Sequence, residues 1–102
     1  MLRIYGVALD VIAGLRSTVK AIEGRDRDLA NQLRRAGSSV VLNIAEGSGS
    51  SGGTRRERYR NALGSARELR ACLDTARAWG YVEHVEALGL REVIGSLVNL
   101  TR

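Results

Sequence analysis

Arginine is the residue type whose number and placement point most directly to chemistry in this sequence. Of the 16 basic residues only Lys20 is a lysine, and the 11 acidic residues leave a net charge of +5. The arginine fork binds phosphate or carboxylate through two parallel hydrogen bonds, a geometry that the lysine ammonium lacks. The composition therefore favours an anionic partner, although GC-rich coding enriches arginine in the same way without a functional cause.

A set of these arginines lies on the helix expected over residues 55–79. At about 100° per residue, five of them fall within a sector of roughly 100° whose only acid is Asp74. The five are Arg56, Arg60, Arg67, Arg70 and Arg77. Arg55 stands at the start of the same helix, where free backbone N–H groups also attract phosphate. Glu57 and Glu68 lie on the opposite flank of the apolar face, so the charges are segregated.

We predict that these six arginines contact nucleic-acid phosphate, and that Arg34 and Arg35 extend the positive surface. Two alternatives remain open: pairing with acidic residues of a neighbouring subunit, and a face that is simply solvated. No base-reading motif or aromatic platform accompanies the arginines, so we expect binding to depend on shape and charge.

No pattern in the sequence predicts catalysis. Residues 47–52 read G-x-G-x-x-G, but dinucleotide binding requires a strand before that motif, and a helix is expected here. His84 has no second histidine or cysteine near it, and Cys72 resembles a small buried hydrophobic residue. We therefore expect no catalytic residue, no metal site, no cofactor and no enzymatic activity.

The composition also excludes several classes of protein. A chain of 102 residues is long enough for one domain, spanning residues 1–102. A lone cysteine excludes a disulfide scaffold, and no apolar run approaches the ~18 residues of a membrane span. Because no basic and apolar leader opens the sequence, we expect a cytoplasmic protein.

Four segments carry apolar residues at steps of three and four, the spacing of amphipathic helices. They predict helices over residues 2–22, 27–46, 55–79 and 82–100, with glycines and a glycine-serine run between them. The absence of proline and of any period-two alternation agrees with this assignment. The predicted fold is all-α, an antiparallel up-down-up-down four-helix bundle.

The apolar faces are thin and rich in alanine, so burial between chains should add needed stability. We therefore predict a homo-oligomer. Four apolar residues lie off the main faces and are candidates for its interface. They are Leu42, Leu63, Leu88 and Val98.

Three blocks of the sequence resemble one known family. They are SVVLNIAEGSG at residues 39–49, Y-x-x-A-L-G-S-A-x-E-L at residues 59–69 and A-x-x-x-G-Y at residues 76–81. In this order and spacing they resemble the four-helix-bundle proteins encoded in 23S ribosomal RNA intervening sequences. The sequence departs from that family in its glycine-serine loop at 50–53 and in its arginine-rich third helix.

The resemblance implies a helical bundle that assembles as a ring, with a pentamer favoured, and it favours RNA as the nucleic acid. A bundle related in fold is the accessory subunit of diversity-generating retroelements, which binds reverse transcriptase and nucleic acid. By that analogy, the alternative function is a scaffold or accessory protein whose ring binds another protein, such as a reverse transcriptase.

The family motif supplies a second set of candidate residues. They are Asn43, Ala45, Glu46, Gly47, Ser65 and Glu68. The polar members flank the apolar faces of the second and third helices. We interpret them as structural residues that bond between helices or hold the turn at Gly47; a ligand role is the alternative.

Overall fold

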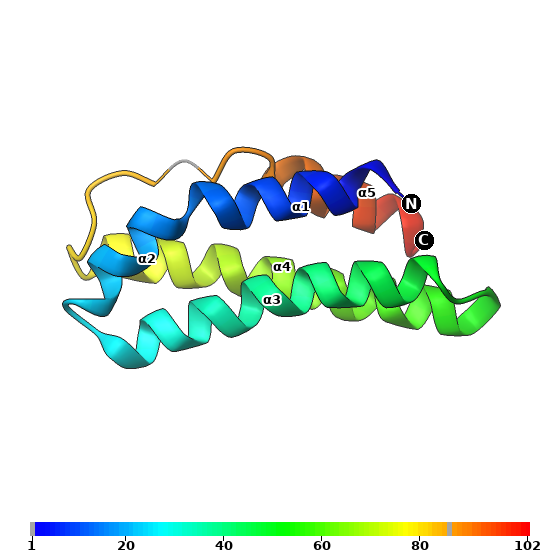
Figure 1. The fold of residues 1–102 in the computed structure, drawn as a ribbon, viewed down its shortest axis with the longest axis horizontal. Helices are drawn as coiled ribbons and strands as arrows, with labels where there is room; N and C mark the ends of the chain where they lie inside the picture. Colours follow the sequence, from blue (N-terminus) through cyan, green and yellow to red (C-terminus); the bar gives the residue numbers. More distant parts are fainter. Residues whose placement is uncertain (1, 86) are drawn as a thin grey trace.

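The computed structural model describes residues 2–85 and 87–102, and all regular structure in these residues is helical (Figure 1). The all-α class is therefore confirmed, with five helices rather than the four predicted. The helices are α1 (Arg3–Gly14), α2 (Arg16–Glu23), α3 (Arg27–Ser48), α4 (Gly52–Ala78) and α5 (Leu90–Leu100). They form an elongated body of 42 × 21 × 19 Å.

The long helices α3 and α4 lie side by side along the whole molecule and form its central hairpin (Figure 1). Asp26 caps α3, because its Oδ1 accepts a hydrogen bond of 2.9 Å from the backbone N–H of Leu29. The predicted apolar faces of both helices are buried, including Val40 and Ile44 on α3 and Leu69 on α4. Alanines on the same faces keep the two backbones close.

The short turn between these helices differs from its prediction. Helix α3 continues through Gly47 to Ser48, and α4 begins at Gly52, so most of the expected glycine-serine linker is helical. The N-cap of α4 is Ser51, which makes no side-chain cap bond, and Thr54 lies within the first turn of the helix. Packing of the hairpin therefore extends both helices beyond their local sequence signals.

The first predicted helix, over residues 2–22, is interrupted at Leu15, where α1 and α2 meet at an angle (Figure 1). The backbone N–H of Leu15 bonds to the carbonyl of Ile12 at 3.1 Å, a tighter closure than an α-helical turn. Gly14, which stabilises a helix poorly, immediately precedes the break. The buried Leu15 side chain anchors this joint in the core.

The last helix was predicted over residues 82–100, but it begins eight residues later, at Leu90. Residues 82–85 and 87–89 are not helical, and position 86 lies outside the described residues. The helix starts only after Gly89, which has a left-handed φ of +92°. A Cβ at Gly89 would lie 2.8 Å from Val7 Cγ1, so both the left-handed backbone and the close approach to α1 require glycine at this position.

Candidate nucleic-acid interface

The turn of the α3–α4 hairpin is fixed by contact between a glycine and a buried ring. A Cβ built on Gly47 would lie 2.4 Å from Cε1 and 2.6 Å from Cδ1 of Tyr59. The Tyr59 side chain is only 3% exposed, so its ring has no solvent-filled space to move into. Packing against Tyr59 therefore requires glycine at position 47.

Arg55 also belongs to this turn. Its Nε donates hydrogen bonds to the carbonyls of Ser50 at 2.8 Å and Gly47 at 3.2 Å. The last carbonyls of a helix have no partner within it, so a basic side chain that binds one stabilises the helix end. Arg55 thus lies at the end of α3, where its Nε is occupied by two carbonyls. In this it differs from the other five predicted arginines.

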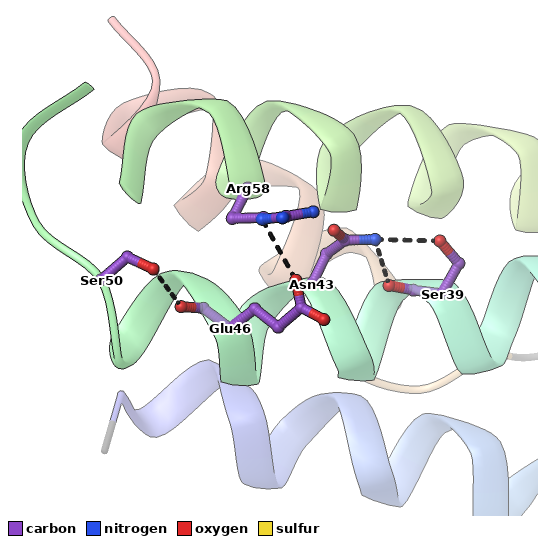
Figure 2. Close-up of polar contacts among 5 residues, drawn as sticks. All are labelled: Ser39, Asn43, Glu46, Ser50 and Arg58. Carbon is purple, nitrogen blue, oxygen red and sulfur yellow. Dashed lines mark hydrogen bonds and ion pairs between the residues drawn. The ribbon is translucent and has the colours of Figure 1, made fainter. Parts of the chain in front are cut away.

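Three polar motif residues, Asn43, Glu46 and Ser65, make contacts within α3 or between α3 and α4, and Figure 2 shows those of Asn43 and Glu46. Asn43 Nδ2 donates to the carbonyl of Ser39 at 2.9 Å and to its Oγ at 3.0 Å. Ser39 Oγ in turn lies 2.7 Å from Ser65 Oγ on α4. Glu46 forms an ion pair of 3.1 Å with Arg58 Nε, also between the two helices.

Two motif residues stand outside this set of contacts. Ala45 is half-buried on α3, and Glu68 is exposed on α4. No hydrogen bond or ion pair of Glu68 is present among the described residues, and its charge acts on the neighbouring Cys72. Burial first, and then the Glu68 charge, raises the pKa of the Cys72 thiol above its ordinary value. The thiol therefore stays protonated and unreactive at neutral pH.

Replacing Ser65 with alanine tests the contact between the two serines. The substitution removes one of the two partners of Ser39 Oγ and leaves Asn43 Nδ2 as the other, and we expect the free energy of unfolding to fall by about 1 kcal/mol. Denaturant unfolding followed by circular dichroism measures this change. Ser38→Ala, at an exposed position on α3, is the matched control and should change stability by less than ~0.5 kcal/mol. Equal stability of the two variants would contradict the assigned contact.

The remaining five predicted arginines form what we call the α4 stripe: Arg56, Arg60, Arg67, Arg70 and Arg77. All five are exposed. Within the described part of the chain none of them makes an ion pair, whereas Arg3, Arg34 and Arg58 pair with Glu92, Glu23 and Glu46. At ~1.5 Å per residue the stripe is about 32 Å long. It is therefore a row of exposed positive charges whose sector holds one acid, Asp74, and no acidic side chain of residues 2–85 and 87–102 forms an ion pair with it.

A second basic surface lies on the α3 side of the hairpin. Arg34, Arg35 and Arg58 line a shallow groove, and Leu42 and Asn43 also line it. Two of these arginines are already paired, Arg34 with Glu23 at 2.9 Å and Arg58 with Glu46. The surface around Arg34 and Arg35, which was predicted to extend the positive charge, is thus more strongly neutralised than the α4 stripe.

An aromatic pair at the far end of α4 is a feature that sequence reasoning missed. The rings of Trp79 and Tyr81 are nearly parallel, with an interplanar angle of 20° and centroids 6.5 Å apart. Trp79 is 69% exposed, and it lies two positions after Arg77, the last residue of the stripe. The signal available in the sequence was the W-G-Y triplet, in which glycine allows the chain to reverse between two aromatic residues.

No group of three metal-ligating side chains occurs among residues 2–85 and 87–102. His84 is exposed. Within the same ranges, no helix has the length and apolar character needed to cross a membrane.

Comparison with known proteins gives one match. Residues 2–101 match the family model described as 23S rRNA-intervening sequence protein. No curated protein and no solved structure matches the chain. The match extends over nearly the whole sequence, and it agrees with the resemblance drawn from the three sequence blocks.

Proposed function

Because the chain belongs to the family of 23S rRNA-intervening sequence proteins, we propose that it is a non-enzymatic, basic protein that binds nucleic acid, with RNA as the favoured ligand. The observation that carries this proposal is the α4 stripe, five exposed arginines that form no ion pair with any acidic side chain the structure describes. Arginine pairs with phosphate oxygens, and neutralised phosphates release condensed counterions. Phosphate contacts carry no sequence information, so we propose recognition by charge and shape.

Mobility shifts of a labelled stem–loop RNA at two salt concentrations test this proposal. We expect complex formation at about 50 mM salt and a large loss of affinity at about 200 mM, because counterion release drives binding. Absence of any complex at the lower concentration would refute the proposal.

We also propose that the protein forms a homo-oligomer, and the family resemblance favours a pentameric ring. We propose a cytoplasmic location as well. If α1 and α2 act as one bent rod, each subunit would be an up-down-up-down four-helix bundle. Exposed apolar side chains support burial between subunits: Leu42 is 61% exposed and Leu88 is 76% exposed. Leu63, by contrast, is in the core and Val98 packs against it, so neither is a free interface residue.

Light scattering tests the oligomer. We expect a particle mass that is a multiple of 11.1 kDa, with five copies favoured. Replacing Leu42 with a charged residue should shift the mass downward, while Leu88→Glu shows whether the second exposed leucine contributes. A stable monomer of 11.1 kDa at micromolar concentration would contradict this part of the proposal.

A second candidate function is an accessory or scaffold protein whose ring binds another protein, such as a reverse transcriptase. The observation in its favour is an apolar groove of about 330 Å³ between α1–α2 and α3. Ile12, Val19 and Leu33 line the groove, and Arg16 and Lys20 stand beside them. Such a surface suits an acidic amphipathic segment. A pull-down that recovers RNA but no protein would count against this candidate.

A further inference from the structure

The end of α4 reverses direction and places two aromatic rings side by side. Gly80 adopts a left-handed φ of +78°. The Tyr81 N–H bonds to the Ala76 carbonyl at 2.9 Å, and the Gly80 N–H bonds to the Arg77 carbonyl at 2.9 Å. This pair of bonds is the Schellman motif, which folds the residue after the glycine back onto the helix. Tyr81 is thereby brought against Trp79.

Contacts from the α2–α3 turn hold Tyr81 in this position. Its hydroxyl donates a hydrogen bond of 3.1 Å to Asp26 Oδ2, while Asp26 Oδ1 caps α3. The Arg25 guanidinium lies 5.8 Å from the centre of the Tyr81 ring, within the range of a cation–π contact. Partial burial and then the bond to Asp26 raise the pKa of Tyr81, so the hydroxyl remains a donor at neutral pH.

Trp79, in contrast, contributes little to the core. It is 69% exposed, although an indole is among the largest apolar side chains. It is supported through its near-parallel ring contact with Tyr81, and Arg77 precedes it on α4. Trp79 is an exposed ring that lies against Tyr81 just beyond the last arginine of the stripe; because residues two apart on a helix face different sides, a strand that follows the stripe reaches this ring around the end of α4. Exposed arginines and an exposed aromatic ring are the two elements of sites for single-stranded nucleic acid.

We propose that Trp79 stacks against an unpaired base of single-stranded RNA whose phosphates lie along the α4 stripe. This inference rests on the proposed function and names the form of RNA that the site takes. Bases within a duplex are stacked on each other and do not offer their faces to a side chain, whereas loops and single strands do. The α4 stripe alone binds phosphates of either form. Trp79 therefore confers preference for the single strand.

The only tryptophan of the chain is Trp79, so intrinsic fluorescence reports directly on this position. The experiment titrates the full chain with a single-stranded RNA and with a duplex of the same length, both at low salt. We expect the single strand to quench the tryptophan fluorescence strongly and the duplex to quench it weakly. Equal quenching by the two RNAs, or none by either, would overturn the inference.

Affinities of variants, measured with labelled RNAs, complete the test. Trp79→Ala should weaken binding of the single strand by roughly 5- to 150-fold, the range of one lost base–aromatic stack. It should leave duplex affinity within about twofold, and Trp79→Phe should retain most of the single-strand affinity. Leu9→Ala removes a different exposed apolar side chain, on α1, and should change neither affinity.

The outcomes separate the two proposals. If the unmodified protein binds both RNAs and Trp79→Ala has no effect, the stacking site is refuted while phosphate binding by the stripe stands. If the unmodified protein binds neither RNA, the proposed function is refuted and the stacking site with it. Circular dichroism verifies that the variants are folded, which is expected because both substituted side chains are exposed.

Discussion

Replacing Gly47 with alanine is expected to lower the free energy of unfolding by about 3 kcal/mol, the upper end of the range for overpacked cores. The added Cβ would lie 2.4 Å from Cε1 of Tyr59, well inside van der Waals contact. Ring carbons of a side chain that is 3% exposed cannot yield as the tip of a flexible side chain does. Relief therefore requires the α3–α4 hairpin to separate at its turn, where Arg55 and Glu46 also make their contacts.

Denaturant unfolding measures this effect, and Gly64→Ala is its matched control. Gly64 is also helical, but a Cβ there meets no atom within 4 Å. That substitution should raise stability by roughly 0.5–1 kcal/mol, because alanine is the better helix former. The double variant Gly47→Ala, Tyr59→Leu has a smaller side chain at the contact. Its loss of unfolding free energy should be smaller than the sum of the losses in the two single variants. Unfolding of Gly47→Ala at the same denaturant concentration as the unmodified protein would contradict the packing account.

Replacing Arg60, Arg67 and Arg70 together with alanine is expected to weaken RNA binding by about 100-fold at 0.1 M salt. The estimate takes three phosphate contacts at a salt exponent of roughly 0.7 each, as for single strands. All three side chains are exposed and none makes an ion pair in the described residues, so the fold should not depend on them. Fluorescence anisotropy with a labelled RNA measures the affinity.

A control variant with the same loss of net charge distinguishes the effect of the position of the arginines on α4 from the effect of overall charge. Arg16, Arg91 and Arg102 are exposed and lie outside α4. Their combined replacement by alanine should weaken binding far less than replacement of the stripe residues. Equal losses in the two triple variants would show that overall charge, and not the stripe, governs binding. If the stripe variant instead loses its oligomeric mass and keeps its RNA affinity, the arginines serve pairing between subunits.

Periodicity predicted the central hairpin correctly because α3 and α4 each bury a single regular face. Residues such as Val40, Ile44 and Leu69 recur at helical steps, and this pattern depends only on the local geometry of a helix. The all-α class and the buried state of Cys72 follow from the same information.

The helix boundaries that failed depend on contacts between distant parts of the chain. Val82 and Val85 are spaced as on a helix, yet they belong to an extended connection that packs along the core. The close approach of Gly89 to Val7 places two segments together that are far apart in sequence. The break at Leu15 likewise preserves the apolar spacing, so no pattern of residue types reveals it.

The features of the candidate site likewise fall into those that local sequence predicts and those that depend on distant contacts. The α4 stripe could be predicted because it lies on one helix, and the angle per residue places its members together. The engagement of Arg55 by two backbone carbonyls could not, since it depends on where α3 ends. The pairing of Trp79 with Tyr81 was missed because the two residues approach only through the left-handed turn at Gly80.

The salt dependence of RNA affinity tests the central claim most directly, because it counts phosphate contacts. The logarithm of the association constant is measured against the logarithm of salt concentration for the unmodified protein and for the Arg60, Arg67 and Arg70 triple variant. We predict a linear decrease for both, with a slope that is shallower by about 2 in the variant. Identical slopes would show that these arginines do not contact the RNA backbone and would contradict the account.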